Sequence, residues 1–210
     1  MKKIVCFGDS NTYGYIPGEG GRYPSEIRYT GILAALLAPY GYCLSEAGVN
    51  GRTTVFDDNT APQRNGSKEL GSILRENDPA DVFVIMLGTN DCKTRFHADV
   101  AAITEGMEIL VSMIRVFDSR IRILLTAPPA IDPSVRIGMF RENFDEESIA
   151  KSRQLGEAYR ELAYRTGCDF LDASKVIHTD PKDGIHLSAE AHAGLAHAIA
   201  HSLLKTPFNV

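Results

Sequence analysis

Two short motifs near opposite ends of the chain carry side chains suited to nucleophilic catalysis. The first, Gly8-Asp9-Ser10-Asn11, directly follows an apolar run at residues 3–7. A serine that follows a strand at the start of a turn or helix lies beside exposed backbone N–H groups, which favour developing negative charge. Ser10 is therefore a candidate nucleophile. Taken alone, however, the tetrapeptide is better explained as a turn or a helix cap.

The second motif, Asp183-Gly184-Ile185-His186, precedes the last helical pattern of the chain. On a tight turn, this spacing lets Asp183 accept a hydrogen bond from one ring nitrogen of His186 while the other nitrogen faces outward. Such a pair supplies the general base of a catalytic triad and the carboxylate that orients it. In isolation the motif also fits a helix-entry turn in which Asp183 stabilises the next helix and His186 has no chemical role.

Two further residues are candidates for stabilising an oxyanion. Asn90 follows the most hydrophobic run of the chain, and its carboxamide can donate a hydrogen bond toward the same crevice as Ser10. Gly51 follows another apolar run and lacks a Cβ, so its backbone N–H can approach a substrate oxygen. The alternative interpretations are an Asx turn at Asn90 and an ordinary turn at Gly51.

Short apolar runs alternate with longer amphipathic stretches along the chain. Continuous hydrophobicity indicates strands covered on both faces, and therefore a parallel sheet. Strands are predicted at residues 3–7, 42–46, 81–87, 120–126 and 169–171. Helices are predicted at residues 30–37, 67–76, 100–117, 146–166 and 188–204. This order predicts a single α/β domain over residues 1–210, a three-layer α/β/α sandwich around a five-stranded parallel sheet with right-handed crossovers.

The candidate residues follow the predicted strand ends. In an open parallel sheet, ligands bind beyond the carboxyl ends of the strands, where the loops gather. Three connections are long, at residues 11–29, 48–66 and 127–145, and loops of this length usually shape a site or an interface. Together the four motifs supply a nucleophile, a base with its orienting carboxylate, and two anion donors. Their joint occurrence predicts an active site that no single motif would establish.

Composition argues against several other classes of protein. The chain has 22 Lys and Arg against 27 Asp and Glu, a net charge of -5 and no long basic run, so a nucleic-acid partner is not expected. The four cysteines show no CxxC pairing and are expected to be reduced and structural. His197 and His201 have chelating spacing but no third ligand, so no metal is expected. No apolar run is long enough for a membrane span, and cleavage of a leader of about 20 residues would remove Ser10, so we expect a cytoplasmic protein.

The joint pattern resembles the SGNH, or GDSL-like, hydrolase superfamily, whose four sequence blocks are marked by Ser, Gly, Asn and His. The blocks match Ser10, Gly51, Asn90 and His186 in the family's order. The first block reads Gly-Asp-Ser-Asn rather than Gly-Asp-Ser-Leu, a departure expected to touch no catalytic role. The resemblance implies a flavodoxin-like fold and a serine esterase without metal or cofactor. It implies a triad of Ser10, His186 and Asp183, and an oxyanion hole formed by Ser10, Gly51 and Asn90.

Additional motifs look like the arylesterase and acyltransferase branch of this superfamily. They are Arg52-Thr53-Thr54, the Asp57-Asp58 loop, Arg64-Asn65-Gly66 and residues 86–91. Members of the branch are bacterial, are often homo-oligomeric, and act on short acyl esters, sometimes with an alcohol as acceptor. The resemblance therefore implies hydrolysis of small acetyl or aryl esters, acyl transfer as an added activity, and a homo-oligomer.

Two other functions remain open at this point. The run Asp9-Ser10-Asn11-Thr12 superficially resembles the Asp-x-Asp-x-Thr signature of Mg²⁺-dependent phosphatases, with Asp9 as nucleophile, although Asn11 stands where the second Asp belongs. A non-catalytic small-ligand-binding domain would keep the same crevice without the chemistry. An α/β-hydrolase is disfavoured because no Gly-x-Ser-x-Gly elbow occurs, and a P-loop because the Lys-Ser/Thr ending is missing.

Overall fold

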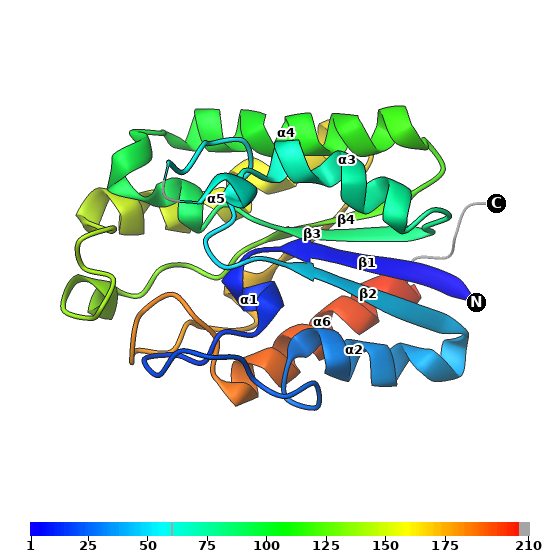
Figure 1. Ribbon diagram of the computed structural model, residues 1–210, viewed down its shortest axis with the longest axis horizontal. Coiled ribbons are helices and arrows are strands. Elements are labelled where there is room, and N and C mark those ends of the chain that lie inside the picture. The colour runs from blue at the N-terminus through cyan, green and yellow to red at the C-terminus, as the bar shows by residue number, and fades with distance from the viewer. Residues whose placement is uncertain (60, 206–210) are drawn as a thin grey trace.

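The computed structural model describes residues 1–59 and 61–205 and is built around one parallel sheet (Figure 1). The strands are β1 (Lys2–Gly8), β2 (Tyr42–Gly48), β3 (Val82–Met86), β4 (Arg122–Ala127) and β5 (Asp169–Asp172). They lie in the order β2-β1-β3-β4-β5, and every neighbouring pair is parallel. The predicted five-stranded parallel sheet and α/β/α fold are confirmed.

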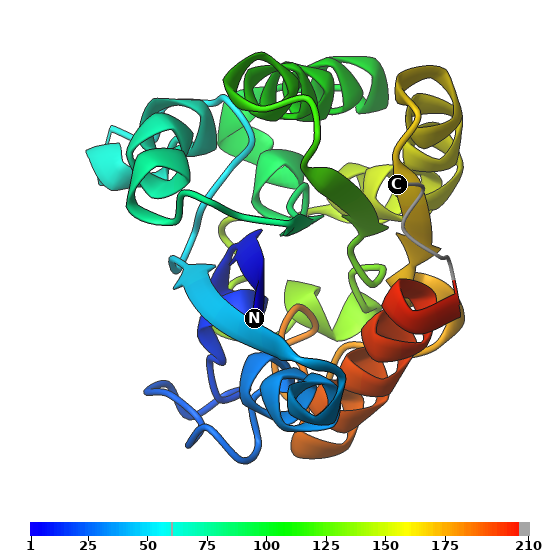
Figure 2. The same cartoon turned by 90° about the vertical axis from the view of Figure 1, so that its right-hand side faces the viewer.

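Helices cover both faces of the sheet, as Figure 1 and the end-on view of the strands in Figure 2 show. On one face lie α3 (Gly66–Glu76), α4 (Val100–Phe117) and α5 (Glu146–Thr166), and on the other lie α2 (Tyr29–Leu37) and α6 (Ala189–Lys205). Each lies within one residue of its predicted bounds. Polar side chains at Asn65, Asp99 and Asp145 cap α3, α4 and α5 by accepting their first N–H groups, which fixes where these helices begin.

Alternate residues of β1 face the two helical layers. Val5 and Phe7 pack in the core beneath α3, α4 and α5, whereas Ile4 and Cys6 pack in the core beneath α2 and α6. All four side chains are completely buried, as a strand with continuous hydrophobicity requires. Burying a large apolar side chain contributes about 1.5–3 kcal/mol. Packing on both faces therefore holds β1 firmly and fixes the position of the segment that follows it.

The carboxyl ends of the central strands meet at one edge of the sheet. Gly8, at the end of β1, pairs with Gly48 of β2 and with Met86 of β3. Short helices follow three of the strand ends: α1 (Ser10–Tyr13) after β1, η3 (Asn90–Cys92) after β3 and η6 (Ala173–Lys175) after β5. Four other 3-10 helices are η1 (Ala38–Tyr40), η2 (Pro62–Arg64), η4 (Thr94–Phe96) and η5 (Pro133–Arg136). The strand register thus places the segments that carry Ser10, Gly51 and Asn90 side by side.

The four cysteines are free thiols. Cys6 and Cys92 are buried, while Cys43 and Cys168 are partly exposed. Burial raises the pKa of Cys92 to about 12, so this thiol stays protonated and packs as a small apolar group. Within the described residues, no helix combines the length and hydrophobicity that crossing a membrane requires.

Candidate active site

Ser10 is the first residue of α1, and only Asp9 separates it from Gly8, the last residue of β1. The Asp9 side chain caps α1 by accepting the Asn11 N–H at 2.9 Å. Gly8 is needed here because a Cβ at that position would lie 2.0 Å from the Thr12 hydroxyl oxygen. Ser10 is 7% exposed and lines a cavity of about 300 Å³. The motif therefore presents one hydroxyl to a small cavity at the carboxyl edge of the sheet.

Ser10, His186 and Asp183 form a continuous chain of hydrogen bonds. The Ser10 Oγ lies 2.9 Å from His186 Nε2, and His186 Nδ1 lies 2.8 Å from Asp183 Oδ2. With Asp183 ionised, Nδ1 carries the proton and donates it, which leaves Nε2 to accept from the Ser10 hydroxyl. His186 is 3% exposed and Asp183 is fully buried. The structure thus brings together the three side chains that the sequence predicted to act jointly.

Hydrogen-bond donors surround the Asp183 carboxylate. Its Oδ1 accepts the backbone N–H groups of Ile185 and His186 at 3.1 and 3.0 Å, and its Oδ2 also accepts the Gly18 N–H at 2.9 Å. Burial alone would raise the pKa of Asp183, but the bonds from His186 and Ile185 hold the pKa below its usual value. The tight turn requires Gly184, with φ of 81°, where a Cβ would lie 2.5 Å from the Val135 nitrogen. Asp183 is therefore a stable anion beside the imidazole.

The two predicted oxyanion donors line the same cavity as Ser10. Gly51 has φ of 83°, and its N–H, like that of Ser10, has no hydrogen-bond acceptor among residues 1–59 and 61–205. Asn90 is 4% exposed, and its Nδ2 donates to the Arg52 carbonyl at 3.1 Å and to Asp9 Oδ2 at 3.3 Å. The Asn90 amide is therefore held in place by the chain itself, and its longer bond, to Asp9, is the one more easily given up.

Asn11 clamps the histidine-bearing loop against α1, a role that the sequence did not indicate. Its Nδ2 donates to the Ile185 carbonyl at 3.0 Å, and its Oδ1 accepts the Leu187 N–H at 3.1 Å. These two bonds hold the backbone on either side of His186. The expectation that the Asn at the fourth position of Gly-Asp-Ser-Asn touches no catalytic role is therefore incomplete, because this side chain fixes where the imidazole lies relative to Ser10.

Aromatic rings pack against His186 from two loops. The Tyr15 ring stacks on the imidazole with centroids 4.2 Å apart, and the Phe140 ring meets it edge-on at 5.4 Å. Both rings line the cavity. Neither residue carried a sequence signal, because each lies in a long connection without periodic hydrophobicity. Together they fix the plane of the imidazole and make this wall apolar.

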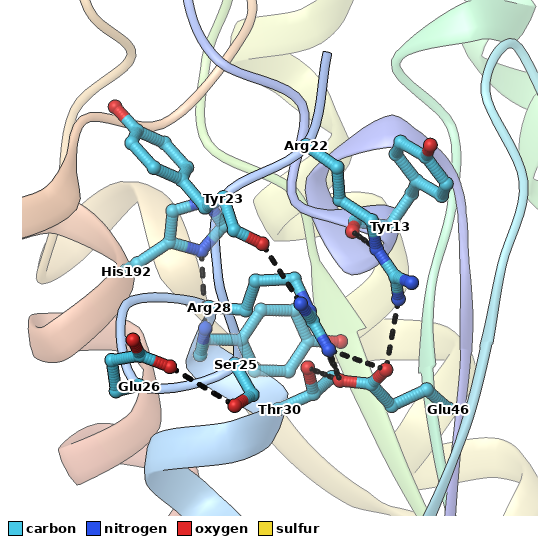
Figure 3. Close-up of polar contacts among 10 residues, drawn as sticks. Tyr13, Arg22, Tyr23, Ser25, Glu26, Arg28, Thr30, Glu46 and His192 are labelled. Carbon is cyan, nitrogen blue, oxygen red and sulfur yellow. Dashed lines mark hydrogen bonds and ion pairs between the residues drawn. The ribbon is translucent and has the colours of Figure 1, made fainter.

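A polar cluster anchors the loop that carries Tyr15 and Gly18 (Figure 3). Glu46, on β2, accepts from Arg22 Nη2 at 2.8 Å and from Arg28 Nη2 at 2.9 Å. Burial alone would raise the pKa of Glu46, but the hydrogen bonds from Arg28 and a neighbouring threonine hold it below the ordinary value. The loop beside the catalytic imidazole is thus tied to the sheet by a carboxylate shared between two guanidinium groups.

The extra branch motifs shape the loop that carries Gly51. Arg52 donates through Nη1 to the carbonyls of Gly8, at 2.9 Å, and Ala47, and its guanidinium stacks 4.4 Å from the Phe7 ring centroid. Burial lowers the pKa of Arg52 to about 10. The Thr54 N–H donates to Asp91 Oδ1 at 2.9 Å, which ties this loop to the segment carrying Asn90. These residues therefore act structurally, by holding the ends of β1, β2 and β3 together.

The cavity also has a cationic wall that the sequence did not indicate. Three cationic side chains line it: Arg64 from η2, Lys93 from between η3 and η4, and Arg95 from η4. Asp58, whose side chain is 1% exposed, pairs with both arginines, at 2.8 Å for Arg64 and 3.6 Å for Arg95.

Asp9 does not line this cavity. It is 2% exposed, and its two oxygens accept hydrogen bonds from Asn11 and Asn90. Burial raises the pKa of Asp9 above its usual value. Among the described residues, no group of three or more His, Cys, Asp or Glu side chains is arranged to hold a metal ion.

Sequence and structure comparisons relate the chain to known esterases. Residues 6–193 match the GDSL-like Lipase/Acylhydrolase family. A carbohydrate acetylesterase from Sinorhizobium meliloti, Est24, is 38% identical over 97% of this chain and 99% of its own, with a TM-score of 0.89. The aryl esterase of M. smegmatis is 33% identical over 97% of this chain and 99% of its own, with a TM-score of 0.87. A search of curated proteins finds no significant match. The family match spans most of the chain and includes all four sequence blocks, so the chain belongs to the GDSL-like lipase/acylhydrolase (SGNH) family and is an esterase.

Proposed function

We propose that this protein hydrolyses small acyl esters through a Ser10-His186-Asp183 triad and a covalent acyl-enzyme. The observation that carries the proposal is the hydrogen-bond chain from Ser10 Oγ through the imidazole to the buried Asp183 carboxylate, beside a small cavity. His186 Nε2 removes the hydroxyl proton as Ser10 Oγ attacks the ester carbonyl carbon. Asp183 stabilises the imidazolium that forms and keeps the proton on Nδ1 in the resting state.

The negative charge of the tetrahedral intermediate is stabilised by three donors. These are the N–H groups of Ser10 and Gly51, which have no acceptor within the described chain, and the Nδ2 of Asn90. Donors fixed in place before the reaction lower the barrier because they need no rearrangement as charge develops. When the intermediate collapses, the C–O bond to the alcohol breaks and the imidazolium proton passes to the leaving oxygen. Water then attacks the acyl-enzyme by the same steps in reverse order.

The substrate we propose has a short acyl group, such as acetyl, on an aryl or other small alcohol. A cavity of about 300 Å³ lies at the lower end of the range for ligand sites. Related structures are named as an aryl esterase and as carbohydrate acetylesterases. We also propose acyl transfer to an alcohol as a second activity. The apolar faces of Tyr15 and Phe140 beside His186 support it, since an alcohol can pack against them and compete with water.

The other features expected from the sequence stay proposals. We propose that residues 1–210 form one domain, since the five strands of the sheet come from points spread along the chain. We propose a homo-oligomer, which agrees with the exposure of Ile137 and Met139 on one of the long loops. A cytoplasmic location stays a prediction. The phosphatase alternative is weakened because Asp9 is buried and both of its oxygens are hydrogen-bonded.

A substitution of the nucleophile tests the proposed function. Ser10→Ala should abolish hydrolysis of 4-nitrophenyl acetate and prevent covalent labelling by a fluorophosphonate, measured as a mass increase of the intact protein. Ser112→Ala, an exposed serine on α4, is the matched control and should be labelled and active like the wild type. Loss of activity with a chelator and its return with Mg²⁺, in a protein whose Ser10→Ala variant stays active, would instead favour the phosphatase that uses Asp9.

A further inference from the structure

Lys93 is a largely buried residue in the wall of the catalytic cavity, and its ammonium group has no partner within the described residues. Lys93 is 8% exposed, and its backbone N–H bonds the Asn90 carbonyl at 3.2 Å. Within residues 1–59 and 61–205, however, its Nζ makes no hydrogen bond or ion pair. A buried charge is costly unless it is paired. A lysine in this position, in the wall of the cavity that Asn90 also lines, is suited to an anion that enters with the ligand.

Neighbouring charges leave this wall positive. Arg64 and Arg95 share the single carboxylate of Asp58, so one negative charge faces three cations. The formal charge of these four groups is +2, and it is +1 when Asp9, whose charge also acts on Lys93, is counted as ionised. Burial lowers the pKa of Lys93 to about 8, with repulsion from Arg95 and Arg64 acting in the same direction. The ammonium is therefore mostly charged at neutral pH, and a single negative charge would neutralise the +1 that remains when Asp9 is ionised.

Other residues that line the cavity are apolar. Tyr15 and Phe140 contribute aromatic faces beside His186, and Phe144 and Ile185 add further apolar side chains. A ligand that fits both the cationic and the apolar part of the lining has a compact apolar body and one anionic group. Ser10 and His186 line the same cavity, so the ester bond of such a ligand would lie at the nucleophile while its charge faces Lys93.

We propose that the substrate is an ester bearing a carboxylate, which the Lys93 ammonium binds directly with Arg64 and Arg95 at its flanks. This inference rests on the proposed esterase function and adds to it the charge of the substrate. Lys93 is then a specificity-determining residue rather than a member of the triad. When Asp9 is ionised the surplus is one positive charge, which a monoanion neutralises and a phosphate dianion would exceed.

Matched pairs of esters test this charge preference. In the first pair, 4-acetoxybenzoate carries the charge on the leaving group, and its methyl ester is neutral. The methyl ester is the intrinsically more reactive acetate because its leaving group is less basic, so a preference for the anion must come from the protein. The measured quantity is the ratio of kcat/KM for the anion to that for the neutral ester. A charge-assisted hydrogen bond predicts a ratio of about 10 to 100 in the wild type.

Substitutions test whether Lys93 causes the preference for the anionic ester. Lys93→Met, which keeps the length of the side chain, should lower the ratio about tenfold or more, and Lys93→Arg should retain much of it. Lys205→Met is the matched control because Lys205 is exposed at the end of α6, far along the helix from the catalytic edge, and should leave the ratio unchanged.

A second pair locates the charge within the substrate. The mono-4-nitrophenyl ester of adipic acid carries its charge on the acyl group, and its methyl ester is neutral. The pair whose ratio depends on Lys93 identifies the half of the substrate that faces the cationic wall. As a measurement independent of any variant, benzoate should inhibit the wild type at least about tenfold more strongly than benzamide does.

The outcomes separate this inference from the proposed function. If neutral esters are hydrolysed and both ratios are the same in the wild type and Lys93→Met, the esterase function stands and recognition of a carboxylate is overturned. Equal inhibition by benzoate and benzamide would overturn it as well, even if Lys93→Met failed to fold. If none of the four esters is hydrolysed, both proposals fail.

Discussion

Replacement of Asn90 by alanine tests the proposed oxyanion hole most directly. The donor bond from Asn90 Nδ2 should strengthen only as the carbonyl oxygen gains negative charge, so its loss should affect the transition state more than bound substrate. Loss of one such donor lowers kcat by about 10²- to 10³-fold. In the resting structure the same amide already bonds Asp9 at 3.3 Å and Arg52 at 3.1 Å. The Asn90 amide loses part of this bonding when it turns toward the oxyanion. We therefore expect Asn90→Ala to lower kcat by about 10²-fold, the lower end of the range, which corresponds to about 2.7 kcal/mol in activation free energy.

The same substitution should also reduce stability. Asn90→Ala leaves the buried Arg52 carbonyl and Asp9 Oδ2 without this donor, and an unsatisfied buried acceptor costs about 1–3 kcal/mol. Both quantities are measurable on one preparation: kcat and KM with 4-nitrophenyl acetate, and the free energy of unfolding from urea titration. KM should stay within a few-fold of the wild type.

A distant asparagine separates the two effects. Asn77 lies at the carboxyl end of α3, and its Nδ2 donates to the Ile73 carbonyl at 2.9 Å. Asn77→Ala should therefore lower the free energy of unfolding while leaving kcat unchanged. A variant at Asn90 whose KM rises sharply with kcat preserved would show that this residue binds substrate, and the oxyanion-hole assignment would be wrong. Failure of Asn90→Ala to fold would assign it a purely structural role.

Three further predictions follow from the site and its surroundings. Asp183→Asn should fold but lose about 10³- to 10⁴-fold in kcat, because an amide can hold the imidazole in the wrong tautomer; near wild-type turnover would place the orienting group elsewhere. Burial lowers the pKa of His192 from 6.5 to about 4, so its contribution to stability is present above pH 6.5 and is lost as the pH falls toward 4. Between pH 7.5 and 5 this loss is about 2 kcal/mol, and His192→Asn, whose Oδ1 can replace Nδ1 as acceptor of the Tyr29 N–H, should show a correspondingly weaker pH dependence in urea unfolding. Light scattering at micromolar concentration should give a multiple of the 23.0 kDa chain mass, and the monomer mass would refute assembly.

Most of the fold could be predicted because its signals are local. The strand β1 has four consecutive buried apolar side chains, which form one apolar run in the sequence. The bounds of α4 and α5 are as predicted because polar caps at Asp99 and Asp145 mark where these helices begin. The short helix α1 was expected only as a turn or helix start. The six 3-10 helices, each one turn long, went unpredicted because a single turn has no periodicity to detect.

The sequence by itself determined the order of the elements and the chemical groups at the ends of the strands. In a parallel sheet all strands end at the same edge, so motifs that follow strand ends lie at one edge however far apart they are in sequence. This is why the sequence predicts a contact between Ser10 and His186, which are separated by 176 residues.

Tertiary structure alone decided what surrounds these groups. The stacking of Tyr15 on the imidazole, the clamp formed by Asn11 and the unpaired ammonium of Lys93 depend on how long loops fold back over the edge of the sheet. Loop residues carry no repeating pattern of hydrophobicity, and their side chains find partners that are distant in sequence. Burial and pairing, which set the charge of a side chain and the ligand it can bind, therefore become visible only when the chain is folded.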